Sequence, residues 1–396
     1  MNIYDKKENE TDYEYGLRLI ETKIEQKPED LSDIVDLLDL DIHKDTLRKA
    51  ASTSPYSGYA VMQYYKKKLD EQASSGNFQI DQKLDEIYNA TIKLRDERNE
   101  LNRIKRDAAR KESLLDNFKK IIAEEVKPIA FTEGRPAKEF NQNDLIVTLS
   151  DLHYGLQVEN VYNIYSPTVA DKRLSKYLEE IQTVVARHNP ENCYLFLGGD
   201  LINGAIRSTT RISNVENVIE QVKNVSILIT FFISNLSKLF KTVEVYSVPG
   251  NHSRIFQNKE DNQLNEYLDN LVPFYLRASL QNFPNIHINT DDYCGELCEF
   301  TVRNHKFVGV HGHHDTVESV VTNMQKMTDG TPDVILMGHR HQNSLRTINK
   351  VKVVESGSFS SMDDYCMEKR LVGYPEQVVL VVSEEKCIEC FYDIQL

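Results

Sequence analysis

Five short groups of aspartate, asparagine and histidine residues follow one another along the second half of the chain. They are Asp151-Leu152-His153, Gly199-Asp200, Gly250-Asn251-His252, His311 and Gly338-His339-Arg340-His341. Carboxylate oxygens combined with neutral imidazoles favour Mn²⁺, Zn²⁺ or Fe²⁺, whereas cages made only of oxygen favour Mg²⁺ or Ca²⁺. The groups hold more donors than one ion needs, so they predict a pair of ions that share a bridging carboxylate. Two such ions, about 3.5–4 Å apart, can activate a bridging hydroxide for attack on phosphorus.

The spacing inside two of these groups allows two side chains to reach one ion. Asp151 and His153 are two residues apart, so on an extended strand both side chains point to the same face. His339 and His341 share this spacing, and they follow a glycine at which the backbone can turn sharply. One such group occurs often by chance, but five of them in this order indicate a single site.

Each group follows a short apolar run that is typical of a buried strand. The runs are LIVTLSD, NCYLFLGGD, VEVYSVPGN, KFVGVHG and DVILMGH, and we expect helices near residues 170–188, 214–240, 262–280 and 315–328 between them. Polar residues at the carboxyl ends of buried strands are the usual way in which an α/β fold builds a site. We therefore expect an α/β domain over residues 145–396.

The ordered set DxH, GD, GNH, H and GHxH resembles the motifs of the calcineurin-like metallophosphoesterase superfamily, over roughly residues 145 to 360. The resemblance implies a two-sheet α/β sandwich flanked by helices, with the site at the carboxyl ends of the strands. It also implies a metal-dependent phosphoesterase, a hydrolase that uses two divalent ions. Mn²⁺ is the first choice for these ions, and Zn²⁺, Fe²⁺ and Mg²⁺ are compatible with the donors.

The same resemblance gives each residue of the set a role. It divides seven ligands between two ions, with Asp151, His153 and His341 on one, Asn251, His311 and His339 on the other, and Asp200 between them. His252 is not a ligand in this scheme, because the corresponding histidine approaches the leaving-group oxygen as a proton donor or charge stabiliser. His313 is an alternative to His311, which we prefer because it comes first after the strand.

Three departures from better-known branches of the superfamily narrow the chemistry. Ser253 follows His252 where an acidic residue often stands, so this histidine needs another group to orient it. The Arg-Gly-Asn-His-Glu sequence that is usual in Ser/Thr protein phosphatases is absent. Asn203 stands where purple acid phosphatases place a tyrosine ligand, which disfavours a tyrosinate-bound ferric ion.

Two arginines are candidates for binding the substrate. Arg254 follows His252 closely in sequence, and Arg207 follows the Asp200 loop. A guanidinium can bind phosphate oxygens with two hydrogen bonds, so both residues could form a phosphate clamp. The alternative for Arg207 is an ordinary position on the surface of a loop.

Residues 1–75 are expected to form short helices. The last of them, HKDTLRKAAS, carries basic residues, and three helices in this order resemble a helix-turn-helix module. In such a module Lys44, Arg48 and Lys49 would contact nucleic acid. The alternative is a helical bundle whose lysines are solvated.

Residues 76–126 show a heptad pattern with one apolar seam, which includes Leu84, Ile87, Leu94 and Leu101. A continuous helix over this span would be about 70 Å long and polar on most faces, so it predicts a coiled coil. The coiled coil is either self-paired, forming a homo-oligomer through residues 78–126, or folded back on the same chain. A solvated helix with internal ion pairs is the alternative. Residues 127–144 contain Gly134-Arg135-Pro136 and are expected to be a linker.

Composition limits the possible substrates and compartments. The 396 residues include 47 Lys and Arg against 61 Asp and Glu, a net charge of −14, so bulk charge does not favour nucleic acid. Any contact with DNA must therefore be local or mediated by cations. The N-terminal sequence has no apolar core of a signal peptide and no segment predicts a membrane span, so we expect a cytoplasmic protein.

Three functions are compatible with these patterns. The first is a nuclease-like phosphodiesterase acting on DNA, which also resembles phage-encoded phosphoesterases with a helical N-terminus. The second is a phosphodiesterase or phosphatase for a small nucleotide or another phosphoester. The third is a non-enzymatic DNA-binding or scaffold protein, which we disfavour because none of the expected ligands is replaced.

Overall fold

The computed structural model describes residues 7, 14–15, 78–132, 140–259, 262, 266–289, 296–328, 330–370 and 373–396. The chain divides into two compact units, Met1–Arg106 and Asp107–Leu396. The helix-turn-helix-like module expected over residues 1–75, with Lys44, Arg48 and Lys49, lies outside the described residues. No helix in the described ranges has both the length and the apolar character that crossing a membrane requires.

The second unit alternates strands and helices. Its strands are β1 (Asn143–Leu149), β2 (Val158–Glu159), β3 (Ile164–Tyr165), β4 (Asn192–Leu197), β5 (Thr242–Ser247), β6 (Ile286–Asn289), β7 (Leu297–Val302), β8 (His305–Val310), β9 (Val334–His341), β10 (Ser344–Ile348), β11 (Val351–Gly357), β12 (Glu376–Ser383) and β13 (Cys390–Gln395). Its helices are α6 (Pro167–His188), α7 (Ser208–Ile212), α8 (Val218–Leu236), α9 (Leu271–Leu280), α10 (Val317–Met327) and α11 (Asp364–Lys369), with short 3₁₀ turns η1 (Asn251–Ser253) and η3 (Leu268–Asn270). Helix α5 (Phe78–Glu125) precedes them and begins in the first unit.

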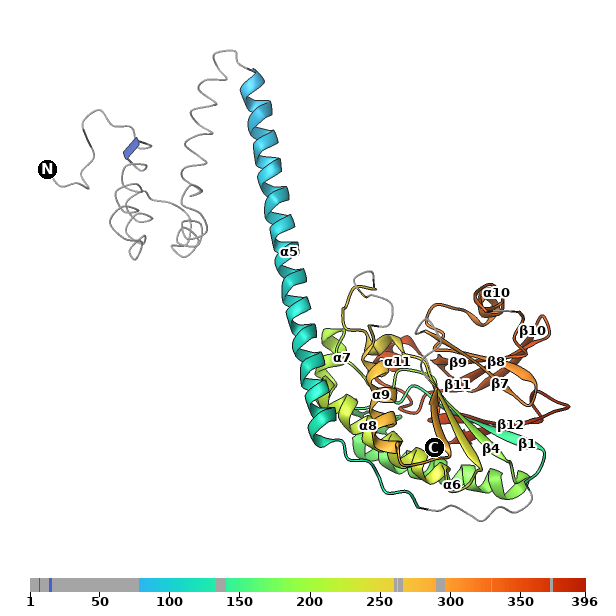
Figure 1. The fold of residues 1–396 in the computed structure, drawn as a ribbon. Coiled ribbons are helices and arrows are strands. Elements are labelled where there is room, and N and C mark those ends of the chain that lie inside the picture. Colours follow the sequence, from blue (N-terminus) through green and yellow to red (C-terminus); the bar gives the residue numbers. More distant parts are fainter. Residues whose placement is uncertain are drawn as a thin grey trace. The chain divides into compact units, whose positions relative to one another are not determined.

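Two mixed sheets form the centre of the second unit (Figure 1). The larger has the order β13-β12-β1-β4-β5-β6, and the smaller has the order β10-β11-β9-β8-β7. Strands β1, β4, β5 and β6 are parallel, as are β8, β9 and β11. The parallel strands of each sheet therefore end at a common edge, which is where their following residues gather.

The side chains of β1 show how the two sheets pack together. Leu145 and Val147 lie in the core beneath α6, α8 and α9, whereas Ile146 lies in the core shared with the smaller sheet. This alternation follows from the two-residue period of a strand, because both faces of the larger sheet are covered. Helix α10 covers the outer face of the smaller sheet, with Val320 and Val321 in a third core. The two-sheet sandwich flanked by helices that the sequence predicted is confirmed.

The sequence explains where the main helices begin. Ser166 caps α6 by accepting a hydrogen bond from the Val169 amide, and Pro167 occupies the first turn, where its missing N–H is not needed. Asn217 and Glu220 form a capping box at the start of α8. Both helices are then held by buried apolar side chains on the face toward the larger sheet.

The last turns of α5 pack on the second unit. Phe118 is only 3% exposed and lies in the same core as Val222 and Leu268. After the helix, the Ile129 amide donates to the Ser279 carbonyl at 3.0 Å, and Phe131 packs edge-on against Phe283. The stretch that the sequence analysis treated as a linker is thus packed over residues 127–132, and the compact unit begins at Asp107 rather than at residue 145.

Candidate metal centre

Five of the candidate ligands sit on unusual backbone at the ends of strands. The residues with positive φ are Asp151 (54°), His153 (45°), Asp200 (50°), His339 (68°) and His341 (60°). The left-handed region is uncommon for any residue with a side chain, and such conformations concentrate at functional sites, where surrounding contacts enforce them. The backbone therefore turns at these points to aim polar side chains into one place.

Glycines make the close approach of the two central loops possible. Gly199 has a φ of 85°, which suits glycine, and a β-carbon there would lie 2.6 Å from the Gly250 nitrogen. A β-carbon on Gly250 would lie 2.0 Å from the Asp200 nitrogen. Because only glycine fits where the two backbones meet, the GD and GNH motifs each carry a glycine before their polar residues.

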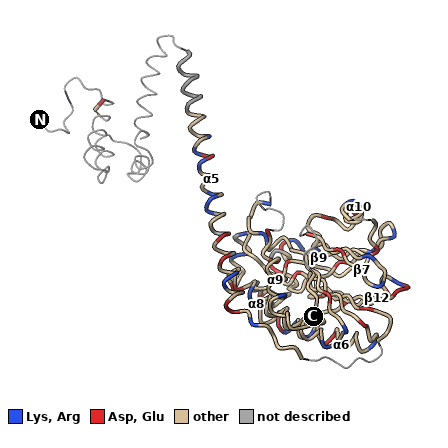
Figure 2. The backbone as a smooth tube through the Cα atoms, viewed as in Figure 1, with Lys and Arg blue, Asp and Glu red and all other residues tan. Residues whose placement is uncertain are grey.

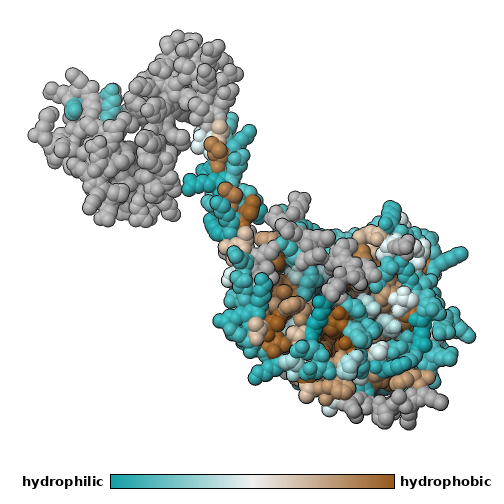
Figure 3. All heavy atoms as spheres, in the orientation of Figure 1, coloured by the Kyte–Doolittle hydropathy of each residue, from teal (hydrophilic) through white to brown (hydrophobic). Residues whose placement is uncertain are grey.

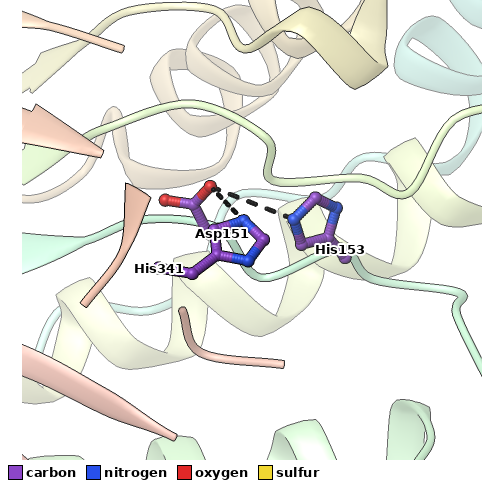
Figure 4. A group of neighbouring side chains, drawn as sticks. All are labelled: Asp151, His153 and His341. Carbon is purple, nitrogen blue, oxygen red and sulfur yellow. Dashed lines mark ion pairs between the residues drawn. The ribbon is translucent and has the colours of Figure 1, made fainter. Parts of the chain in front are cut away.

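Asp151, His153 and His341 form the first group (Figure 4). The Nε2 atom of His341 lies 3.2 Å from the Oδ1 atom of Asp151, and the Nε2 atom of His153 lies 3.9 Å from the same oxygen. The other oxygen of Asp151 accepts hydrogen bonds from the Ser150 hydroxyl and the His339 amide. One oxygen of this carboxylate is thus fixed by the protein, while Oδ1 faces the two imidazoles.

Asp200, His311 and His339 form the second group. The Nε2 atom of His311 lies 3.2 Å from Oδ2 of Asp200 and 3.3 Å from Oδ1 of Asn251. Its other ring nitrogen, Nδ1, donates to the Gly198 carbonyl at 2.8 Å, which fixes the ring and leaves Nε2 directed at the site. Six of the seven candidate ligands therefore lie in these two groups, and the seventh, Asn251, contacts His311 of the second group.

His252 lies beside both groups, within reach of His153 and Asp200. Its backbone amide donates to Oδ1 of Asp200 at 2.7 Å, and its ring is 4.6 Å from the ring of His153. The ring Nδ1–H donates to the Asn203 carbonyl at 3.1 Å. This carbonyl supplies the orienting partner that the sequence lacks at Ser253, and it leaves Nε2 free to face a substrate.

The two aspartates of the site each pair with a histidine, Asp151 with His341 and Asp200 with His311. Burial alone would raise the pKa of Asp151, but the hydrogen bond and charge of His341 lower it to about 2. Burial opposes the charged form of His311, yet Asp200 raises its pKa to about 9. The carboxylates are therefore ionised at neutral pH, as metal ligands must be.

Two other histidines are held neutral. Burial, aided by the charge of His252, lowers the pKa of His153 to about 3, and burial with the charge of His311 lowers that of His339 to about 4. Neutral imidazole is the form that binds a metal ion. In addition, both ring nitrogens of His153 are buried without a hydrogen-bond partner among the described residues. Such atoms are costly unless another group satisfies them, so these residues fit divalent ions well.

Two further residues, Asp269 and Gln377, hold this arrangement in place, and no sequence motif predicted them. The carboxylate of Asp269, fully buried behind the loop, accepts the Gly250 amide at 3.0 Å. The buried side chain of Gln377 donates to the carbonyls of Ser150 and Gly357, which ties the ends of β1 and β11 together. Asp269 and Gln377 lie in ordinary sequence contexts, so no spacing could have singled them out.

The two candidate substrate residues lie next to the site. Arg254 is only 6% exposed, and its Nε donates to the Asn251 carbonyl at 3.0 Å. Burial lowers the pKa of Arg254, and the nearby positive charge of Arg207 adds to this effect. Arg207 is exposed at the start of α7. His313, the alternative to His311, belongs instead to a separate group with Glu296 and His314.

Comparison with known proteins identifies this architecture. The sequence matches the family described as calcineurin-like phosphoesterase over residues 145–379, which is more than half of the chain. The chain belongs to the calcineurin-like phosphoesterase family. It is accordingly a metal-dependent hydrolase of phosphoesters, and residues 145–379 contain every strand-end group described above.

A prophage-derived protein and several solved structures are similar to this calcineurin-like phosphoesterase. An SPbeta prophage-derived uncharacterized protein, YonJ, of Bacillus subtilis is 19% identical over 76% of either chain. Among solved structures, a novel archaeal phosphodiesterase is 15% identical, with 64% of this chain and 99% of that chain covered and a TM-score of 0.31. YfcE, a phosphoesterase from E. coli, is 13% identical, with 63% and 100% covered and a TM-score of 0.31.

Proposed function

We propose that this phosphoesterase is a dinuclear enzyme that hydrolyses phosphodiester bonds, with DNA as its substrate. The observation that carries the dinuclear assignment is the position of Asp200. Its carboxylate belongs to the group with His153 and His252 and also to the group with His311 and His339. A carboxylate between two sets of imidazoles is the arrangement that a bridging ligand requires.

Each candidate residue then has a defined task. Asp151, His153 and His341 would hold one ion, Asn251, His311 and His339 the other, and Asp200 both. Bound divalent ions would supply activation of water and neutralisation of negative charge at phosphorus. We favour Mn²⁺, because mixed carboxylate, amide and imidazole donors suit it, with Zn²⁺, Fe²⁺ and Mg²⁺ as alternatives.

His252 is placed to serve the leaving group. Its Nδ1–H is engaged by the Asn203 carbonyl, so Nε2 is the nitrogen available to carry a proton toward the substrate. The hydrogen bond from its backbone amide to Oδ1 of Asp200 keeps this histidine close to the candidate metal ligands. In this position it would protonate the departing oxygen, which stabilises a poor leaving group such as the alkoxide of a deoxyribose.

The preference for DNA rests on local rather than global charge. The net charge of −14 disfavours bulk attraction, but Arg254 is buried beside Asn251 with its Nη atoms free of hydrogen bonds in the described part of the chain. Arg207 adds a second positive charge nearby. Two guanidiniums next to a pair of divalent ions would bind consecutive phosphates of a polynucleotide.

A substrate screen tests this assignment. The purified full chain with Mn²⁺ is offered single- and double-stranded DNA, RNA, cyclic nucleotides, bis-p-nitrophenyl phosphate and p-nitrophenyl phosphate. We expect cleavage of DNA, and we expect Arg254→Gln to raise KM for DNA at least about tenfold while it changes bis-p-nitrophenyl phosphate hydrolysis less.

Arg187→Gln is the matched control, because Arg187 is exposed at the far end of α6. Hydrolysis of cyclic nucleotides or monoesters without any cleavage of DNA would instead establish the second candidate, a phosphoesterase for small substrates. Equal loss in the Arg254 and Arg187 variants would remove Arg254 from the substrate site.

A further inference from the structure

A second cluster of possible ligands lies outside the candidate dinuclear centre. Glu296, His313 and His314 bring one carboxylate oxygen and two imidazole nitrogens within 4.8 Å of one another. Glu296 immediately precedes β7, and the two histidines follow β8, the antiparallel neighbour of β7. The pairing of these strands therefore places the three residues at one end of the smaller sheet.

His313 has no other role in the described structure. Both of its ring nitrogens are buried without a hydrogen-bond partner among the described residues. A buried imidazole with two unsatisfied nitrogens is costly, and the cost is offset if one nitrogen binds a cation.

The other two residues are already oriented for this purpose. Oε2 of Glu296 lies 3.0 Å from Nε2 of His314, while its Oε1 accepts the Tyr267 hydroxyl at 2.5 Å. The rings of His313 and His314 lie 3.9 Å apart, centre to centre. The Tyr267 hydroxyl thus fixes Oε1 of Glu296, and Oε2 of Glu296 faces His314. A simple surface ion pair of Glu296 with His314 would leave His313 unexplained.

From this geometry we infer that Glu296, His313 and His314 bind a third divalent ion, of the Zn²⁺ type, at the rim of the dinuclear centre. Two imidazoles and one carboxylate are the protein ligands of open zinc sites, which keep a fourth position for water or a substrate oxygen. The ring of His313 lies 5.4 Å from that of His311 and 6.2 Å from that of His339, so this ion is a neighbour of the main site. Its open position would accept a phosphate oxygen that flanks the reacting one.

Metal stoichiometry tests the third site without relying on activity. The full chain is stripped with a chelator, loaded with Zn²⁺, desalted and measured by inductively coupled plasma mass spectrometry. We expect about three zinc ions per chain for the wild type and about two for Glu296→Gln/His314→Asn, because the third ion loses two of its three ligands. His287→Asn is the matched control, since His287 is a half-exposed histidine near Glu244 and far along the chain from the cluster. It should keep about three ions.

A main-site variant separates this inference from the proposed function. Asp200→Asn/His311→Asn should lose the ions of the main site and still bind Co²⁺ at the rim, with the visible absorption of a low-coordinate Co²⁺ complex. That absorption should vanish when Glu296→Gln/His314→Asn is added, while circular dichroism shows that the fold is retained. An equal zinc content in the wild type and in Glu296→Gln/His314→Asn would overturn the inference. So would Co²⁺ absorption that persists after these two substitutions are added to the main-site variant.

Discussion

At the scale of single residues, burial disfavours the charged forms of Asp151 and His311, whereas pairing with an opposite charge favours them. Four of the seven candidate ligands are buried, namely Asp151, His153, Asp200 and His311. The sequence predicted all seven candidates because they stand in compact motifs behind apolar strands. The groups that orient them were not predictable in the same way. The Asn203 carbonyl is backbone, which any residue carries, and Asp269 reaches the loop from 3₁₀ turn η3. Only the folded chain brings such partners together.

The role of His252 can be tested through the leaving group. A proton donor matters most when the departing oxygen is basic, so His252→Asn should slow hydrolysis of a thymidine dinucleotide by about 10²–10⁴-fold. The same variant should slow bis-p-nitrophenyl phosphate far less, because nitrophenolate leaves without a proton. Steady-state kcat/KM for both substrates provides the comparison. An equal loss on both substrates would mean that His252 acts on binding or on metal position instead.

Ion binding should release protons at neutral pH. The pKa of His311 without ions is about 9, above its ordinary value of 6.5, because Asp200 outweighs the effect of burial. The ring is therefore protonated at pH 7, and a divalent ion must displace that proton. Apparent metal affinity should rise between pH 6 and pH 8.5. Titration calorimetry in two buffers of different ionisation enthalpy measures the release, expected to be about one proton or more per chain. Buffer-independent heats would contradict this assignment.

At the scale of elements, the strand ends were predicted well and the first helix only in part. Strands β1, β4, β5, β8 and β9 lie where the apolar runs predicted them, because a buried strand between polar loops has a clear pattern. Helix α5 was expected as a coiled coil outside the enzyme domain, yet Phe118 near its end is part of the enzyme core. A heptad pattern describes spacing along one helix and does not reveal which turns meet another element.

Removing Phe118 should therefore destabilise the enzyme unit. The side chain is 3% exposed, and Ile255, just beyond the His252 loop, helps to line the apolar surface around it. Phe118→Ala should lower the free energy of unfolding by about 3 kcal/mol. Urea unfolding monitored by circular dichroism measures this change. Phe231→Ala is the control, because Phe231 is 55% exposed on α8 and its truncation should cost less than about 1 kcal/mol. Equal effects would show that α5 does not stabilise the unit.

The apolar seam of α5 remains available for a partner helix, and we propose that a second copy of the chain covers it. Leu94 is 66% exposed and Leu101 is 50% exposed, and apolar patches are visible among the polar side chains of the helix (Figure 3). Charges of both signs lie along its described turns, as in helices that pair through ion pairs at the edge of the seam (Figure 2).

Lysines in the seam should separate the copies. We expect Leu94→Lys/Leu101→Lys to reduce the mass in solution to that of one chain, measured by light scattering, because two positions that the proposed coiled coil would bury become charged. Asn99→Lys/Asn102→Lys adds the same charge at exposed positions on the helix and should keep the oligomer. A wild type that is already a single chain would contradict the coiled coil.

At the scale of the whole molecule, the chain joins an enzyme unit to an N-terminal unit in which the long helix α5 begins. The family match covers residues 145–379 and shows a metal-dependent phosphoesterase. The net charge of −14 is compatible with a phosphate substrate because the acidic groups of the site, Asp151 and Asp200, are ligands that divalent ions would neutralise. The positive charge needed for a phosphodiester would then be supplied by ions and by Arg254, at one place.

The central claim is that hydrolysis of a phosphodiester depends on divalent ions held around Asp200. Its most direct test is kcat/KM for bis-p-nitrophenyl phosphate before chelation, after chelation and after return of Mn²⁺. We expect activity to disappear with the chelator and to return with Mn²⁺. Asp200→Asn should remain about 10³-fold below the wild type, a loss of about 4 kcal/mol in transition-state stabilisation. Asp116→Asn, on the exposed surface of α5, should match the wild type. Activity that survives chelation, or an Asp200→Asn variant as active as the wild type, would contradict the account.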